Sequence, residues 1–127
     1  MVTTKRILVI DDEEDIREVA QLSLEMVASW DVMTASSGRE GLAKAEVEPL
    51  DAILLDVMMP DWDGTTTFQQ LQANPVTQHI PVLLLTAKMQ AADQRRFAQL
   101  GVKAVIAKPF DPMTLADQVA KSLGWDI

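Results

Sequence analysis

This chain contains a set of carboxylate, hydroxyl and ammonium side chains that together could take part in phosphoryl transfer. Carboxylates lie at Asp11, Asp12 and Asp56, and a hydroxyl and an ammonium follow at Thr86 and Lys108. Two carboxylates about 5 Å apart repel each other by about 3 kcal/mol at an effective dielectric constant near 20. Three such groups therefore favour a hard divalent cation, and Mg²⁺ accepts a few carboxylates while it keeps several water molecules.

Asp56 is the residue of this set that could react with phosphorus. A carboxylate can attack a phosphoryl group and form an aspartyl-phosphate. Phosphoryl transfer depends on in-line positioning and on neutralisation of the equatorial oxygens more than on a base. The cation would hold one of these oxygens, Lys108 a second and Thr86 a third. This chemistry requires the side chains to meet, although they are far apart in the sequence.

Each part of the set follows a short run of apolar residues. The four runs are residues 7–10, 52–55, 82–85 and 104–107. Apolar runs of this length that alternate with helical segments are typical of parallel strands covered on both faces. The carboxyl ends of such strands lie along one edge of the sheet, where ligands bind. The sequence therefore predicts a single site at that edge.

Five strands that alternate with five helices are expected, and the second strand is Trp30–Ala35. The helices are expected from the acidic segment 11–15 to Val27, from the turn 36–38 to Glu48, and over residues 65–72, 89–100 and 112–123. In the first of them, residues repeat at helical spacing: Ile16, Val19, Ala20, Ser23, Leu24 and Val27. Alternation of strands and helices implies right-handed crossovers and helices on both faces of the sheet. The length suits one domain over residues 1–127.

The composition argues against several classes of function. Hydrophobic residues make up 48% of the chain, which is enough for a core. The net charge of −8 argues against binding to nucleic acids and to anionic membranes, because both depend on basic residues. The absence of cysteine excludes disulfides, thiolate chemistry and cysteine zinc sites. No stretch approaches the roughly 20 apolar residues of a membrane span, and residues 1–6 lack a signal-peptide layout, so we expect a cytoplasmic protein.

Five sequence motifs occur in one order at domain-scale spacing. They are ILVIDDE at residues 7–13, TASSGREGL at 34–42, DVMMPDWDG at 56–64, PVLLLTA at 81–87 and KPF at 108–110. Together they resemble the receiver domain of two-component response regulators, over essentially the whole chain. The resemblance implies a flavodoxin-like α/β fold, in which a doubly wound five-stranded parallel sheet has the order 2-1-3-4-5 and carries five helices.

The same resemblance assigns roles to the site residues. Asp56 is the phosphoacceptor, Thr86 is the switch hydroxyl, Lys108 contacts the phosphoryl group, and Mg²⁺ is held by Asp11, Asp12, Asp56 and the backbone carbonyl of Met58. The implied donor is a sensor histidine kinase or a phosphotransfer protein. The implied target is a protein that binds the face of helix 4, strand 5 and helix 5, and a phosphorylation-dependent dimer stays open. No enzymatic activity is implied beyond self-directed phosphotransfer and slow autodephosphorylation.

One position departs from the family pattern. Receivers commonly carry Tyr or Phe three positions before the lysine, and this ring changes position together with the threonine. Val105 stands there in this chain, so the aromatic half of the usual coupling has no ring to move. Met58 and Lys88, two residues after Asp56 and Thr86, flank the expected site. We hypothesise that they tune the lifetime of the phosphoryl group by hindering or steering water.

Other classes of function compete with a phosphorylation switch. A phosphatase or mutase with an aspartyl-phosphate intermediate typically has an acid two residues after the nucleophile, where this chain has Met58. A nucleotide-binding module would need a glycine-rich loop after the first strand, where Asp11 and Asp12 would repel a pyrophosphate. A receiver-like interaction module that is never phosphorylated stays open because of Val105. A phosphorelay intermediate within a larger regulator stays open as well.

Overall fold

The computed structural model describes residues 4–126 as five strands and five helices that alternate along the chain. The strands are β1 (Arg6–Ile10), β2 (Asp31–Ala35), β3 (Ala52–Asp56), β4 (Val82–Thr86) and β5 (Ala104–Ala107). The helices are α1 (Glu14–Ala28), α2 (Gly38–Val47), α3 (Gly64–Ala73), α4 (Ala91–Leu100) and α5 (Leu115–Leu123). Within the described range, no helix is both long and apolar enough to cross a bilayer.

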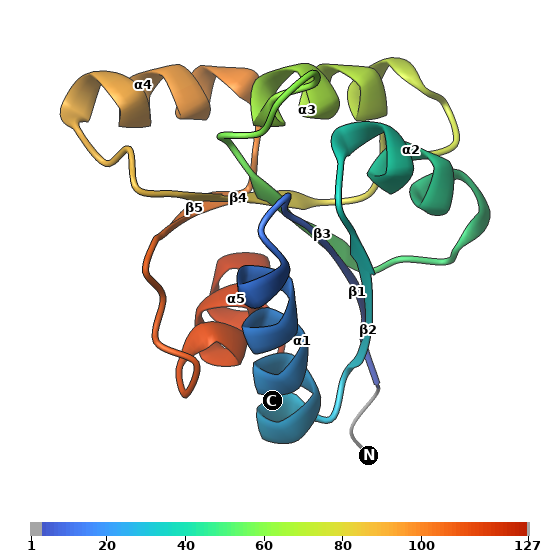
Figure 1. Ribbon diagram of the computed structural model, residues 1–127, viewed down its shortest axis with the longest axis vertical. Coiled ribbons are helices and arrows are strands. Elements are labelled where there is room, and N and C mark those ends of the chain that lie inside the picture. Colours follow the sequence, from blue (N-terminus) through green and yellow to red (C-terminus); the bar gives the residue numbers. More distant parts are fainter. Residues whose placement is uncertain (1–3, 127) are drawn as a thin grey trace.

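All five strands pair in parallel, in the order β2-β1-β3-β4-β5. Figure 1 shows α1 and α5 together on one face of this sheet, and α2, α3 and α4 on the other. Because helices cover both faces, every residue of β3 and β4 is buried. The predicted doubly wound α/β fold with the strand order 2-1-3-4-5 is therefore confirmed.

The sheet separates the hydrophobic core into two layers. Successive side chains of a strand point to opposite faces. Ile7 and Val9 of β1 therefore pack with the layer of α1 and α5, whereas Leu8 and Ile10 pack with the layer of α2, α3 and α4. Burial of each such side chain contributes about 1.5–3 kcal/mol. β1 is thus held from both faces, and so is the acidic pair that follows it.

The last helix begins later than the sequence predicted. Pro112 suits a first helical turn, but α5 begins at Leu115. The cause is local hydrogen bonding around Asp111. Its carboxylate accepts from the N–H of Met113 at 2.9 Å, and its carbonyl accepts from the N–H groups of Thr114 and Leu115. The Asp111 carbonyl is thus shared between a tight turn to Thr114 and the first helical bond to Leu115, so a turn over residues 112–114 leads into the helix.

The outer side of α1 exposes apolar residues. Ala20, Ser23 and Leu24 are buried, but Val19 and Val27 of the same periodic pattern are 40% and 46% exposed. These two valines form part of a larger apolar surface with residues of the turn before α5. We call it the α1 surface, and its residues are Val19, Leu22, Met26, Val27, Pro112 and Met113. Together with Ser23 they line a groove of about 380 Å³.

Candidate functional site

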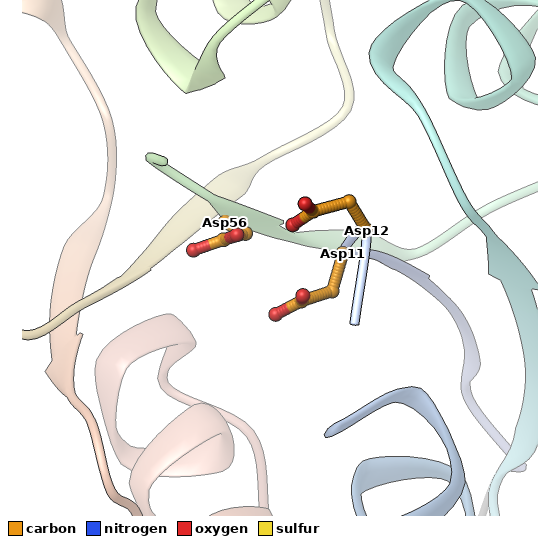
Figure 2. Close-up of side chains that lie close together, drawn as sticks. All are labelled: Asp11, Asp12 and Asp56. Carbon is orange, nitrogen blue, oxygen red and sulfur yellow. The ribbon is translucent and has the colours of Figure 1, made fainter. Parts of the chain in front are cut away.

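Three carboxylates meet at the carboxyl edge of the sheet, where the strand pattern predicted them. Asp11 and Asp12 directly follow β1, and Asp56 is the last residue of β3. β1 and β3 are neighbours in the sheet, so their ends lie side by side. One oxygen from each carboxylate lies within 4.8 Å of the others, and Figure 2 shows the three side chains gathered at one place.

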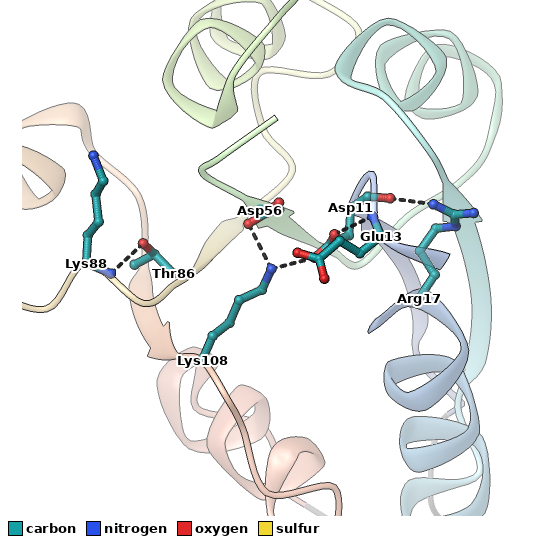
Figure 3. Close-up of polar contacts among 7 residues, drawn as sticks. All are labelled: Asp11, Glu13, Arg17, Asp56, Thr86, Lys88 and Lys108. Atoms are coloured by element: carbon teal, nitrogen blue, oxygen red, sulfur yellow. Dashed lines mark hydrogen bonds and ion pairs between the residues drawn. The ribbon is translucent and has the colours of Figure 1, made fainter. Parts of the chain in front are cut away.

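Lys108 bridges two of these carboxylates. It follows β5 at the same edge, and its Nζ donates to Asp11 Oδ2 at 2.8 Å and to Asp56 Oδ1 at 2.9 Å (Figure 3). The Lys108 side chain is 14% exposed, and those of Asp11 and Asp56 are 0% and 3% exposed. Water screens buried charges weakly, so the three groups depend on one another for compensation. The peptide bond between Lys108 and Pro109 is cis.

Burial and neighbouring charges act in opposite directions on this cluster. Burial raises the pKa of Asp56, the hydrogen bond from Lys108 lowers it and the charge of Asp11 raises it, with a net value of about 6. For Lys108, burial lowers the pKa, but the hydrogen bonds to Asp11 and Asp56 outweigh that effect and raise it. Lys108 is therefore charged at neutral pH, and Asp56 is a carboxylate whose pKa lies close to neutrality.

The donor atoms of the cluster fit a magnesium ion, because Mg²⁺ prefers oxygen ligands with negative charge. The Asp12 side chain is exposed, and Lys108 contacts only Oδ1 of Asp56 and not Oδ2. The Met58 carbonyl accepts no hydrogen bond within residues 4–126. Asp11 differs, because both of its carboxylate oxygens already accept hydrogen bonds. The least engaged oxygens therefore belong to Asp12, Asp56 and Met58.

Thr86 lies at the same edge but outside the hydrogen-bonded cluster. It ends β4 beside β3, is 1% exposed, and its Oγ1 accepts a hydrogen bond from the N–H of Lys88 at 2.9 Å. Within the described range no hydrogen bond joins Thr86 to Asp56 or to Lys108. The hydroxyl proton of Thr86 is thus free for donation to another acceptor. Figure 3 shows the Lys88 side chain directed away from Asp56.

The edge formed by α4 and β5 is attached to the core by few buried side chains. Val105 of β5 is half-buried and packs with the core layer on the side of α4. In α4, all of whose residues are described, Phe97 is the one buried side chain. The helix follows an exposed segment, residues 87–90. A shift of α4 would therefore disturb little of the core.

The loop after Asp56 is held at both of its sides. Gly64 begins α3 so close to the strand that a Cβ at this position would lie 2.5 Å from the Asp56 carbonyl oxygen. Only glycine permits this approach. At the tip of the loop, Arg39 of α2 pairs with Asp61 at 2.6 Å and stacks on Trp62, 4.5 Å from the ring centroid. The loop that carries the Met58 carbonyl is thus tied to two helices.

Two arginines support the site although the sequence reasoning did not identify them. Arg39 holds the loop after Asp56, and Arg17 of α1 donates from Nη1 to the backbone carbonyl of Asp11 at 2.8 Å. The available signal for Arg17 is one basic residue in an acidic helix start. Such a residue is usually solvated, so its charge alone does not mark it as part of a site.

The fold and the acidic edge define a receiver of the response regulator class. The family model described as "Response regulator receiver domain" matches residues 7–120. The chain therefore belongs to the response regulator receiver domain family. Among solved structures, the chemotaxis response regulator CheY4 of Vibrio cholerae has a TM-score of 0.87 and 30% identity, over 94% of this chain and 99% of that one. A putative response regulator from Chloroflexus aurantiacus has a TM-score of 0.86 and 30% identity, over 96% and 99%.

The curated relatives are longer proteins. The alkaline phosphatase synthesis transcriptional regulatory protein PhoP of Bacillus subtilis is 44% identical over 108 residues, which cover 85% of this chain and 44% of that protein. The DNA-binding dual master transcriptional regulator RpaA of Synechocystis is 42% identical over 106 residues, which cover 84% and 44%. The chain thus spans less than half the length of these two relatives.

Membership in the family establishes the general role of the chain. Receiver domains are signalling domains of two-component systems that switch on phosphorylation, and they are not conventional enzymes. They interact with histidine kinases or phosphotransfer proteins and with downstream targets. They generally bind Mg²⁺ at an acidic pocket, and the cluster of Asp11, Asp12 and Asp56 is compatible with this ion.

Proposed function

We propose that this chain is a phosphorylation-activated switch of a two-component system or phosphorelay, a single cytoplasmic receiver domain over residues 1–127 with Asp56 as its phosphoacceptor. The observation that carries the proposal is the double contact of Lys108 Nζ, at 2.8 Å to Asp11 and 2.9 Å to Asp56. A buried ammonium beside a carboxylate nucleophile is placed to neutralise the charge that a phosphoryl group brings.

The proposed reaction transfers a phosphoryl group from a phosphohistidine of the donor protein to Asp56. One carboxylate oxygen of Asp56 forms an O–P bond in line with the P–N bond, which breaks. The electron pair of the broken bond stays on the imidazole nitrogen of the donor, so no base on this chain is required. Lys108 would contact one phosphoryl oxygen, and the hydroxyl of Thr86 would donate to another.

The acidic cluster would hold the metal ion that this transfer requires. We assign Asp11, Asp12, Asp56 and the Met58 carbonyl as its ligands. A bound Mg²⁺ neutralises negative charge on the phosphoryl oxygens. The charge of the carboxylates supports this assignment, as do the oxygens of Asp12 and Asp56 that accept no side-chain hydrogen bond within residues 4–126.

The aspartyl-phosphate is expected to hydrolyse slowly. Two residues after Asp56 stands Met58, whose side chain is apolar and 61% exposed. A thioether does not take a proton from water, so this position supplies no general base. The same observation weighs against a phosphatase or mutase, which would need that base for turnover.

The response to phosphorylation is proposed to begin at Thr86. The added group brings about −1.5 to −2 units of charge, and charge-assisted hydrogen bonds to it contribute about 1.5–3 kcal/mol each. A shift of an equilibrium from 1:99 to 99:1 requires about 5.5 kcal/mol. Thr86 gains a new bond, while Lys108 exchanges bonds that it already has. We propose that the result is read on the face of α4, β5 and α5, by a downstream protein or by a second copy.

A donor protein needs a docking surface beside Asp56, and the α1 surface is suited to this role. It begins at Val19, close to the Arg17 that contacts Asp11, and it continues at Pro112, shortly after Lys108. Exposed apolar patches of this kind mark protein contacts, because their burial contributes about 25 cal/mol per Å². We propose that the phosphohistidine-bearing donor, a sensor kinase or a phosphotransfer protein, binds there.

NMR spectra in the presence of Mg²⁺ and a beryllofluoride mimic test the proposal, together with phosphorylation by acetyl phosphate. The wild type is expected to show beryllofluoride-induced shifts that require Mg²⁺ at Thr86, Lys108 and residues 87–90, and Asp56→Asn should show no beryllofluoride-induced shifts. Asp117→Asn removes an exposed carboxylate of α5 and should behave like the wild type. A wild type without any Mg²⁺-dependent response would exclude the phosphorylation switch.

A receiver-like interaction module that is never phosphorylated is the alternative that one observation favours, because Val105 provides no aromatic ring beside Thr86. Under this alternative, the wild type and Asp56→Asn bind a partner equally well under phosphorylating conditions. A phosphorelay intermediate would behave differently. It would be phosphorylated without any change on the face of α4, β5 and α5, and it would then pass the phosphoryl group to a histidine.

A further inference from the structure

Asp12 is the carboxylate of the cluster that no side chain holds in place. Asp11 is fully buried with both oxygens hydrogen-bonded, and Asp56 is bonded to Lys108. Asp12 is exposed, and within residues 4–126 its carboxylate takes part in no hydrogen bond or ion pair. It nevertheless points toward Asp56 in Figure 2. Its direction therefore depends on the backbone that carries it.

Arg17 holds this backbone. Its Nη1 donates to the Asp11 carbonyl at 2.8 Å in a partly buried contact (Figure 3). That carbonyl belongs to the peptide that joins Asp11 to Asp12, so the bond restricts rotation of this peptide plane. On the other side of the residue, the Asp11 N–H donates to the Ala35 carbonyl of β2 at 3.1 Å. The main chain that leads into Asp12 is thus fixed from two sides.

The place of Arg17 in α1 supports a role outside helix stability. It is the only basic residue of this helix, next to the acidic first turn of Glu14 and Asp15. Near a helix N-terminus, positive side chains interact unfavourably with the helix dipole and negative ones favourably. Arg17 therefore stands where the helix itself favours an acid. Its contact with the Asp11 carbonyl gives this position a physical reason.

We propose that Arg17 is a positioning residue of the magnesium site, which acts through the Asp11–Asp12 peptide and does not touch the ion. The inference rests on the proposed function, since it deepens the role of the acidic cluster. Two effects of removing Arg17 have opposite signs. Loss of a positive charge strengthens the binding of a cation. Loss of the hydrogen bond frees Asp12 and weakens binding, and groups that orient metal ligands typically contribute about 10–100-fold to affinity.

Calorimetric titration with Mg²⁺ at neutral pH separates these two effects. Arg17→Met is expected to raise the Kd for Mg²⁺ about tenfold, because the freed peptide outweighs the lost charge. Arg17→Lys keeps the charge but lacks the planar guanidinium, so its Kd should lie between those of the wild type and Arg17→Met. Arg95→Met is the matched control, since it removes the same charge from an exposed position of α4 and should leave the Kd unchanged.

A double substitution tests whether Arg17 acts through Asp12. In an Asp12→Asn background, Arg17→Met should add little to the Kd, whereas independent effects would multiply. For the single variant Arg17→Met, the rate of phosphorylation by acetyl phosphate at saturating Mg²⁺ should equal that of the wild type. The reason is that Arg17 touches neither Asp56 nor the phosphoryl group. A general structural loss would lower this rate as well.

The outcomes distinguish the inference from the function on which it rests. Equal or tighter Mg²⁺ binding by folded Arg17→Met overturns the positioning role, and so do independent effects in the double variant. A wild type that does not bind Mg²⁺ contradicts the proposed function itself. Circular dichroism in EDTA checks that each variant is folded. If Arg17→Met does not fold, Arg17→Lys is compared with the wild type in its place. An unchanged Kd for Mg²⁺ in Arg17→Lys would then contradict the positioning role.

Discussion

The two halves of the site differ in how completely they are assembled. On β1, β3 and β5, the charged groups are already in contact, since Lys108 lies 2.8 Å from Asp11 and 2.9 Å from Asp56. On β4 and α4, the Thr86 hydroxyl accepts from a backbone N–H and contacts none of these charges. Of the ten residues in the helix beside it, Phe97 alone is fully buried, and Leu100 packs against the core while partly exposed.

This difference separates acceptance of a phosphoryl group from the response to it. Charges that are already in place need little reorganisation when the group arrives, which favours transfer. A switch, by contrast, requires contacts that are stronger in one state than in the other. The half with Thr86 and α4 can supply such contacts, because they are still to be made. Substitutions in the first half should therefore act on stability and metal binding, and those in the second on the response.

Lys108→Met is the substitution with the largest expected effect, because it breaks the assembled half. It leaves the carboxylates of Asp11 and Asp56 buried without their cation. Removal of one partner of a buried ion pair costs about 3–5 kcal/mol. Urea denaturation in EDTA should show the free energy of unfolding reduced by this amount, and Mg²⁺ should restore part of it.

Lys121→Met is the matched control for this substitution. The Lys121 side chain is 80% exposed, and its ion pair with Asp117 lies on the surface. The free energy of unfolding should change by less than about 0.5 kcal/mol. Equal effects of the two substitutions would mean that the bridge at Asp11 and Asp56 contributes nothing to stability.

Thr86→Ala should act only on the other half. It removes one charge-assisted hydrogen bond, about 1.5–3 kcal/mol, from the free energy that favours the phosphorylated conformation. Mg²⁺ affinity and phosphorylation of Asp56 should stay near wild type, while the beryllofluoride-induced NMR shifts of α4 shrink. Thr86→Ser keeps the hydroxyl and should keep these shifts. A large loss of Mg²⁺ affinity in Thr86→Ala would show that the two halves are not separate.

The assembled half was largely predictable from the sequence. Asp11, Asp56 and Lys108 each follow an apolar run, and a parallel sheet places the ends of such runs at one edge. The register of the strands then brings them together without further information. The orientation of Thr86 was not predictable, because it depends on the position of one backbone N–H in the following turn.

The features that the sequence did not predict depend on the path of turns or on which side chains cover a surface. The contact of Arg17 with the Asp11 carbonyl depends on the path of the short segment between β1 and α1, which periodicity does not predict. Periodicity predicted apolar positions in α1 but not that Val19 and Val27 stay uncovered. The late start of α5 depends on the tight turn after Asp111, whose carbonyl accepts from the N–H of Thr114 as well as from that of Leu115.

The pH dependence of stability offers a smaller test of the assembled half. The pKa of Asp56 is about 6 in the folded chain, against an ordinary value of 3.8. Between these values the folded state binds more protons than the unfolded state, so this group makes the free energy of unfolding fall as pH rises. From about pH 5 to about pH 7 the loss should be about 1 kcal/mol.

The contribution of Asp56 is measured as a difference, because other groups also titrate. Urea denaturation of the wild type and of Asp56→Asn in EDTA, at a series of pH values, cancels the groups common to both. The wild type should lose more stability than Asp56→Asn as pH rises through 6. A difference of opposite sign would mean that Lys108 outweighs burial and holds the pKa of Asp56 below its ordinary value.

Met58→Asn should have the smallest effect, and it tests whether the side chain and the backbone carbonyl of one residue in the assembled half act separately. We assign the carbonyl of Met58 to the proposed metal site, whereas its side chain is 61% exposed. An amide can orient water beside the aspartyl-phosphate, although it takes no proton. Hydrolysis should therefore accelerate only a few-fold, which lowers its activation free energy by less than about 1.4 kcal/mol. The decay of phosphorylated Asp56 after removal of acetyl phosphate measures this rate, with Met113→Asn as the exposed control.

The Kd of Met58→Asn for Mg²⁺ should not change, because the backbone carbonyl remains. A higher Kd would show that the Met58 side chain helps to hold its own carbonyl in place.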